Sequence, residues 1–232
     1  MPTAQGVGRL IARGIAPVAR NVSPQAAGGV LRRVLELAID GYGKLPGART
    51  AAGRQLQRHS GDVDDAIESI ISHHVRLASA QGFVTNLGGV ATMPVAIPAN
   101  LAGVAVLQTR MVAAVAHLRG YDVNDLRVRT ALVMCLLGED QVTKRIGAGS
   151  LPTSPMAIAT APVFDAALDA QVAEAVMADL ASRIGGKNVA LAVTRRVPLL
   201  GGGIGAVVDG MATAQIGAYA KRELVRRRAL GH

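Results

Sequence analysis

Two long stretches of the sequence carry almost no charge. Leu77 to Thr109 contains no charged residue, and Val197 to Ala220 contains only Asp209. Uncharged segments of this length are stable when they are buried against other protein or placed in a bilayer. Pro94 and Pro98 interrupt the first stretch, and a bilayer tolerates such breaks only where neighbouring protein satisfies the freed backbone groups. Two interpretations stay open. The stretch is either a buried helix preceded by an extended turn, or part of a helical hairpin that enters a bilayer.

Apolar residues recur at helical spacing along the chain, and no segment alternates with the period of two that is typical of strands. Start and stop residues predict helices over residues 24–40, 62–82, 100–117, 126–137 and 165–184, and a last helix after Pro198. We expect Asn124 to cap the fourth helix and Gly185-Gly186 to end the fifth. With no Trp, two Phe and three Tyr in the chain, Ala, Val, Leu and Ile form most of the core. We therefore predict an all-α fold, a multi-helix bundle with closely packed Gly/Ala-rich helices.

Small residues recur every fourth position in the second uncharged stretch. One line consists of Gly202, Ala206, Gly210, Ala214 and Ala218, and an adjacent line of Gly201, Gly205, Thr213 and Gly217. Missing side chains let another helix backbone approach closely, in membranes and in aromatic-poor soluble proteins alike. We predict a helix-packing surface on Gly202, Ala206, Gly210 and Ala214.

Charge is concentrated at the two ends of the chain. Residues 1–60 carry a net charge of +7, residues 61–193 carry −3 and residues 194–232 carry +5, which together give the formal +9. Basic ends suit polyanionic partners such as anionic lipid or nucleic acid. We predict that Arg226, Arg227 and Arg228 anchor the protein electrostatically to an anionic membrane, where each contributes about 1 kcal/mol. A solvated helix end whose cations complement the helix dipole is the alternative.

The first twenty residues do not form a signal peptide, because arginines interrupt their apolar residues before an apolar core region is reached. We expect a cytoplasmic protein. On a helix over residues 6–20 the apolar side chains lie opposite the arginines, which fits either an interfacial helix or a terminal helix docked on the core.

The usual signatures of catalysis and of cofactor or metal binding are weak or absent. Gly201, Gly203 and Ala206 fit a dinucleotide-binding pattern, but no strand–helix–strand context surrounds them. His73 and His74 are adjacent, so on a helix they point about 100° apart and do not share a metal in the usual way. The single cysteine, Cys135, lies in an apolar run that indicates a buried thiol. We predict no cofactor, no metal and no catalytic residue.

The turn around Gly120-Tyr121-Asp122 is the most polar candidate. It starts a helix that carries Arg127, and Gln108 and Arg110 stand on the helix before it. We predict a polar or head-group site formed by Gln108, Arg110, Tyr121, Asp122 and Arg127, with Asp122 and Arg110 as a pair. The alternative is a capped turn in which Asp122 and Asp125 pair with Arg127 or Arg110.

A series of motifs in a fixed order resembles the EcsC family over about residues 60–220. The motifs are Gly82-Phe83-Val84-Thr85-Asn86-Leu87-Gly88-Gly89, Met93-Pro94-Val95-Ala96-Ile97-Pro98-Ala99-Asn100-Leu101, Gln108-Thr109-Arg110-Met111, Gly120-Tyr121-Asp122, and Val128-Arg129 leading into Cys135-Leu136-Leu137-Gly138. Asn86 and Asn100 depart from the Gly and Asp expected there. The family is named after a gene in an operon for an ABC transporter linked to protein secretion, so the resemblance implies a bacterial protein near a membrane and no particular reaction.

These observations predict one domain over residues 1–232, in which residues 1–60 pack on a family core of residues 61–220, followed by a basic tail of residues 221–232. We hypothesise a non-enzymatic protein that associates with the inner face of the membrane by binding anionic lipid or a membrane complex. Self-association into a homo-oligomer also stays open. A basic protein with weak, sequence-independent nucleic-acid binding is the second hypothesis, and an enzyme with a polar site near Asp122 is the third.

Overall fold

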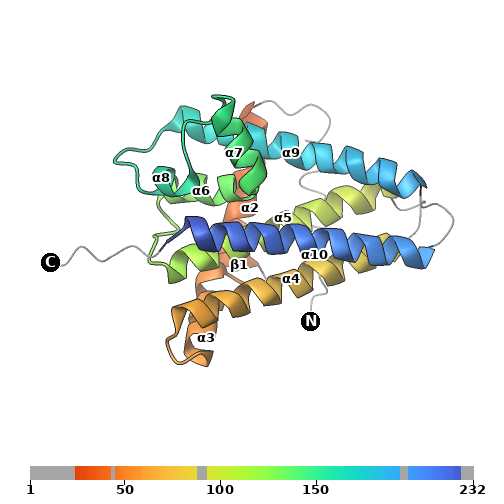
Figure 1. Cartoon of the computed structure of the whole chain (residues 1–232), viewed down its shortest axis with the longest axis horizontal. Helices are drawn as coiled ribbons and strands as arrows, with labels where there is room; N and C mark the ends of the chain where they lie inside the picture. The colour runs from red at the N-terminus through yellow and green to blue at the C-terminus, as the bar shows by residue number, and fades with distance from the viewer. Residues whose placement is uncertain (1–23, 43–44, 88–92, 194–197, 226–232) are drawn as a thin grey trace.

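The computed structural model describes residues 24–42, 45–87, 93–193 and 198–225, and helices dominate this part of the chain (Figure 1). The predicted all-α fold is confirmed. The elements in chain order are α2 (Pro24–Asp40), β1 (Gly41–Tyr42), β2 (Leu45–Pro46), α3 (Ala48–Arg58), α4 (Val63–Leu87), α5 (Met93–Leu118), α6 (Leu126–Cys135), α7 (Glu139–Gly147), α8 (Pro155–Ala159), α9 (Ala166–Val193) and α10 (Pro198–Glu223).

Helix α5 forms the centre of the molecule. Its residues from Met111 to Ala116 are completely buried, and it contacts α2, α3, α4, α6, α9 and α10. A helix that is apolar on all sides is stable only inside a protein or a membrane. Because this segment consists of Met, Val and Ala, other helices can pack against every side of α5 at short range.

Helix α10 lies antiparallel along α4, with small residues at the contact (Figure 1). A Cβ atom added to Gly210 would lie 2.2 Å from the Ser79 hydroxyl oxygen, and one added to Gly217 would lie 2.9 Å from Cγ2 of Ile71. Ala206 and Ala214 are half-buried. Gly202 belongs to α10, but its surroundings lie outside what the structure describes.

The N-terminal helices pack onto this centre. Helix α2 contacts α5 and α9, and α3 contacts α4 and α5. Between them, Gly41 and Tyr42 pair antiparallel with Pro46 and Leu45. The chain returns so closely that a Cβ atom on Gly47 would lie 2.2 Å from the carbonyl oxygen of Ile39. This turn brings the backbone of β2 toward α5.

Several predicted helix ends are wrong. Helix α4 continues past Gly82 to Leu87, and α9 continues through Gly185-Gly186 to Val193. A single glycine costs a helix only about 1 kcal/mol, which tertiary packing routinely outweighs. Helix α5 begins at Met93 rather than near residue 100, so that Pro94 and Pro98 fall in its first two turns, where each proline removes at most one hydrogen bond.

Three helices and one cap were missed or misassigned. Helices α3, α7 and α8 were not predicted, because they are short and α3 and α7 have little apolar content. Helix α6 ends at Cys135, and its cap is Asp125 rather than Asn124. The Asp125 carboxylate accepts a hydrogen bond from the backbone N–H of Arg127 at 2.9 Å. Either residue type can cap a helix, so the sequence alone did not distinguish them.

Candidate functional site

A small basic cleft lies where α3, α4 and α5 meet β2. Its volume is about 210 Å³. We call it the basic cleft, and its lining residues are Pro46, Ala51, Arg54, Gln55, Arg58, Ile70, His73, His74 and Arg110. The arginines of α3 project from successive turns of one helix face, because positions 54 and 58 are four residues apart.

Arg110 of α5 is the buried cation of the basic cleft, with only 4% of its surface exposed. Its Nε donates a hydrogen bond to the backbone carbonyl of Pro46 at 2.8 Å. One terminal nitrogen lies 3.3 Å from Nε2 of His74. These contacts hold the guanidinium between β2 and α4, and both partners are uncharged acceptors.

His74 is neutral in this arrangement. An arginine can only donate, so Nε2 of His74 accepts the hydrogen bond from Arg110. The ring proton is therefore on Nδ1, which donates to the Ile70 carbonyl at 2.7 Å. Burial, reinforced by the nearby charge of Arg110, lowers the pKa of His74 to about 3. His74 thus orients Arg110 without neutralising its charge.

The electrostatic environment of the basic cleft is uniformly positive. None of its lining residues is acidic. Burial lowers the pKa of Arg110, and the charge of Arg54 lowers it further. Partial burial and then the charges of Arg110, Arg76 and Arg58 lower the pKa of His73. Proximity of this many cations without a carboxylate is unfavourable, and a bound anion would relieve it.

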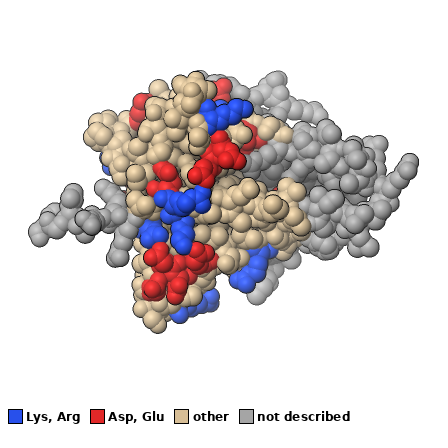
Figure 2. All heavy atoms as spheres, in the orientation of Figure 1, with Lys and Arg blue, Asp and Glu red and all other residues tan. Residues whose placement is uncertain are grey.

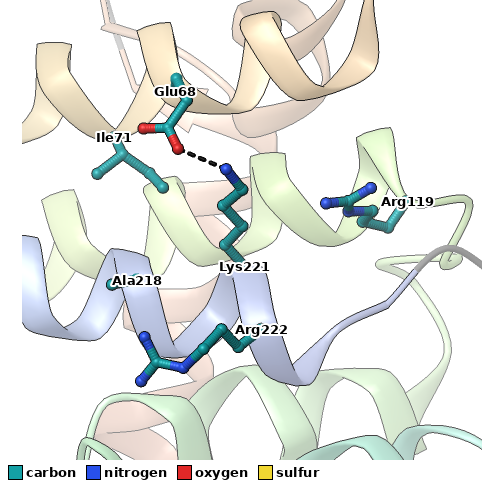
Figure 3. Close-up of a pocket in the computed structure, with 6 residues that line it drawn as sticks. All are labelled: Glu68, Ile71, Arg119, Ala218, Lys221 and Arg222. Carbon is teal, nitrogen blue, oxygen red and sulfur yellow. Dashed lines mark hydrogen bonds and ion pairs between the residues drawn. The ribbon is translucent and has the colours of Figure 1, made fainter.

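A second hollow, shown in Figure 3, is different in character. It measures about 310 Å³ and is lined by Glu68, Ile71, Arg119, Ala218, Lys221 and Arg222. Its cations have acidic partners: Lys221 pairs with Glu68, Arg222 with Glu139, and Arg119 with Asp64 at 2.8 Å. Figure 3 shows the Lys221–Glu68 pair crossing from α10 to α4. These pairs join neighbouring helices and leave less net charge for a ligand than the basic cleft does.

The structure does not bring the five predicted polar residues together in one site. Gln108 donates to the Thr213 hydroxyl of α10 at 3.1 Å, and the Tyr121 hydroxyl donates to the Val225 carbonyl at 3.1 Å. Arg110 points into the basic cleft instead of pairing with Asp122. The exposed Asp122 carboxylate accepts from the backbone N–H of Asn124.

Arg127 belongs to the capped turn that was the alternative to this site. It forms an ion pair with Asp125 and donates to the Ala161 carbonyl. The hydrogen bonds from Arg127 hold the pKa of the Asp125 carboxyl below its usual range. The cation therefore connects the start of α6 to the segment after α8.

Other sequence-predicted features do not add to a site. Arg226, Arg227 and Arg228, like the helix predicted over residues 6–20, lie outside the described residues. Cys135 is buried, which raises the pKa of its thiol. In the described part of the chain, no group of three or more His, Cys, Asp or Glu side chains is arranged to hold a metal.

Sequence reasoning missed most of the basic cleft. Arg54 and Arg58 belong to a short polar helix that has too few apolar residues to be predicted from their spacing. Pro46 takes part in the cleft only through its backbone carbonyl, which accepts the hydrogen bond from Arg110. Arg110 is a predicted site residue, but its neighbours differ from the predicted ones, because nothing in the sequence indicates that β2 packs against α5. One signal was available in the sequence. No Asp or Glu stands between Glu68 and Asp122, so Arg110 has no acidic residue near it along the chain.

The two uncharged stretches meet at one end of the molecule. Figure 1 shows the hairpins α4–α5 and α9–α10 reaching the same end, away from α3, α6 and α7. Side-chain contacts agree, because Gly210 faces Ser79 while Lys221 pairs with Glu68, so α10 begins beside the end of α4. Acidic and basic side chains lie next to one another on the described part of the face in Figure 2. Among the described residues no helix is long and apolar enough to cross a membrane.

The EcsC protein family model matches residues 55–230 of the chain, which includes α4 to α10 and the end of α3. No curated protein and no solved structure matches it.

Proposed function

The chain belongs to the EcsC protein family, and we propose that it is a peripheral membrane protein that contacts anionic lipid surfaces through the end of the molecule where α4 and α9 end and α5 and α10 begin. We call this the hairpin end. The observation that carries the proposal is that both uncharged stretches of the sequence reach this end together. Burial accounts for residues Val104 to Thr109 of the first stretch, but Val207, Val208 and Met211 of the second stretch are exposed and apolar.

In the sequence intervals that connect α4 to α5 and α9 to α10, the charged residues are basic. No Asp or Glu stands between Glu68 and Asp122, or between Asp179 and Asp209. The second interval contains Arg183, Lys187, Arg195 and Arg196. Apolar segments flanked only by cations suit the interface of an anionic bilayer, because the cations attract lipid phosphates while the apolar residues enter the head-group region.

Large apolar side chains are exposed in the half of α10 that is nearer to the hairpin end. Val207, Val208 and Met211 are 58%, 46% and 59% exposed. Their spacing of three and four residues puts them on one helix face. Three adjacent exposed apolar side chains support contact with lipid.

The test is co-sedimentation of the full chain with vesicles of phosphatidylcholine alone and with added phosphatidylglycerol, over a series of salt concentrations. We expect binding that needs the anionic lipid and weakens with salt. The double variant Val207→Glu/Met211→Glu should bind about 10-fold or more weakly, because it places two carboxylates against anionic lipid.

Val163→Glu is the matched control. Val163 is 75% exposed in the segment between α8 and α9, far along the chain from the hairpin turns, so the same type of change should leave binding intact. Replacing Arg226, Arg227 and Arg228 by Gln should weaken binding at low salt if the tail is an anchor. Equal binding to neutral vesicles, or an unaffected Val207→Glu/Met211→Glu variant, would refute the proposal. Indifference to lipid together with retention by DNA would instead favour the nucleic-acid hypothesis.

A further inference from the structure

We propose that the basic cleft binds a phosphate-type anion: inorganic phosphate or the phosphate group of a phosphomonoester. The proposal does not depend on the membrane contact, because it rests on α3, the middle of α4 and α5, and β2. It concerns residues that the family resemblance and the hairpin end leave unexplained.

The first argument is the charge balance around a buried cation. An arginine that is 4% exposed has lost most of its hydration, and such residues are usually paired with a carboxylate. Arg110 has a backbone carbonyl and a neutral imidazole as its partners in the cleft. Arg54 and Arg58 add two more cations at the rim. An anion in the cleft would supply the missing countercharge.

The second argument is preorganisation. The guanidinium of Arg110 is fixed from two sides, by Pro46 at 2.8 Å and by His74 at 3.3 Å. The Pro46 carbonyl is itself held in place by the pairing of β2 with β1. A ligand that binds an already oriented guanidinium loses less free energy in ordering the site. The neutral His74 fixes the orientation and leaves the positive charge available.

The geometry and the size of the cleft indicate the class of anion. Guanidinium groups match the oxygens of phosphate in bidentate hydrogen bonds, and three of them suit an anion with two charges and several acceptor oxygens. A volume of about 210 Å³ accommodates a phosphate with a small substituent rather than a nucleotide. Free phosphate, a soluble phosphomonoester and the head group of phosphatidic acid share this chemistry.

His73 provides a local reporter of occupancy. The charged and titratable groups around it are Arg54 and Arg58 of α3, Arg76 and His74 of α4, and Arg110 of α5. All the charges among them are positive, so they disfavour the imidazolium form. A dianion in the cleft would offset them and raise the pKa of His73.

The experiment is isothermal titration calorimetry of the full chain with inorganic phosphate, and NMR titration of the His73 ring with and without saturating phosphate. We expect saturable binding and a higher pKa of His73 in the bound state. Arg54→Gln/Arg58→Gln should weaken binding about 10-fold or more, since it removes two exposed cations without disturbing the core.

Arg49→Gln is the matched control on the same helix. Arg49 pairs with Asp40 and does not line the cleft, so its loss should change the affinity less than about 2-fold. If Arg49→Gln and Arg54→Gln/Arg58→Gln lose the same affinity for phosphate, the binding is general attraction by a basic protein, and the proposal is overturned. The absence of binding and of any change in the pKa of His73 with all three probes named below would also overturn it.

Glycerol 3-phosphate and phosphatidylcholine vesicles containing phosphatidic acid are the other two probes. Binding of either soluble probe, sensitive to Arg54→Gln/Arg58→Gln, supports a free anion as the ligand. Binding of the vesicles alone, with the same sensitivity, supports a lipid head group. Val207→Glu/Met211→Glu should bind inorganic phosphate normally, so a failure of the membrane proposal is distinguishable from a failure of this one.

Discussion

Replacing Gly217 by Ala tests whether close packing of α10 on α4 holds the bundle together. An added methyl group at Gly217 would lie 2.9 Å from Cγ2 and 3.1 Å from Cγ1 of Ile71, and 3.2 Å from the sulfur of Met111. Met111 is completely buried, whereas Ile71 is 9% exposed and borders the hollow of Figure 3, so the contact with Met111 has less room to relax than the contact with Ile71. Gly217→Ala should therefore strain the core.

The magnitude follows from two opposing contributions. A Gly-to-Ala change in a helix interior stabilises by about 1 kcal/mol through the unfolded chain and the helix backbone. Overpacking a filled core destabilises by about 1–3 kcal/mol. We expect Gly217→Ala to lower the free energy of unfolding by about 0–2 kcal/mol, the difference between these two contributions.

Gly53→Ala in α3 is the matched control, because nothing lies within 4 Å of its added methyl group. It should gain the full helix contribution, about 1 kcal/mol, or about 2–4 °C in Tm for a chain of this size. Gly210→Ala should fall between the two, since the obstructing atom is the Ser79 hydroxyl oxygen at 2.2 Å, which can rotate away. Gly210→Leu should destabilise clearly by overfilling the contact.

Urea unfolding followed by far-UV circular dichroism measures all four variants. The decisive comparison is Gly217→Ala against Gly53→Ala, which share the same chemical change. If Gly217→Ala is as stable as Gly53→Ala, then α10 is not closely packed on α4 at this point, and the reasoning from small residues to helix contact fails.

Two further predictions concern buried titratable groups. The pKa of His74 is lowered to about 3 in the folded protein, so between its usual value of 6.5 and 3 the unfolded chain binds more protons and stability falls as pH falls. From pH 7 to pH 5, protonation of His74 in the unfolded chain should lower the free energy of unfolding by about 2 kcal/mol. In urea unfolding at a series of pH values, the stability of His74→Gln should depend less on pH than that of the unchanged protein. Equal dependence of the two proteins on pH would contradict a buried neutral His74. Cys135 is buried and the pKa of its thiol is raised, so a thiol reagent should label it about 10-fold or more slowly in the folded protein than in urea. At completion each chain should carry one label, since Cys135 is the single cysteine. Fast labelling without urea would place Cys135 at the surface.

The class of fold was predictable because local signals agree on it. Helical spacing, the absence of alternating segments and an aromatic-poor apolar content all favour packed helices, and α2 begins at Pro24 as its cap and proline predicted. The ends of helices were less predictable. Gly82 and Gly185 break the local preference for helix, but α4 and α9 continue through them, and that preference is weaker than tertiary packing.

The basic cleft could not be assembled from the sequence, for a different reason. Its cations come from α3 and α5, and the orientation of Arg110 depends on a backbone carbonyl of β2, where the identity of the side chain carries little information. The sequence gives no role to His74 beyond a polar helix surface, and it gives no access to the tautomer of the ring. Burial keeps the His74 ring neutral, and the contact with Arg110 identifies its Nε2 as the acceptor.

The geometry of α5 separates the basic cleft from the hairpin end. Arg110 is the residue at which the first uncharged stretch ends, and Met93 is where α5 begins. With a rise of 1.5 Å per residue, these positions are about 26 Å apart along the helix. One leaflet of a bilayer has a hydrocarbon depth of only about 15 Å, half of the usual core thickness. With α5 along the bilayer normal, shallow insertion of the hairpin end leaves the basic cleft beyond the phosphate layer of that membrane. This arrangement favours a soluble phosphate or phosphomonoester as the ligand over a head group of the same bilayer.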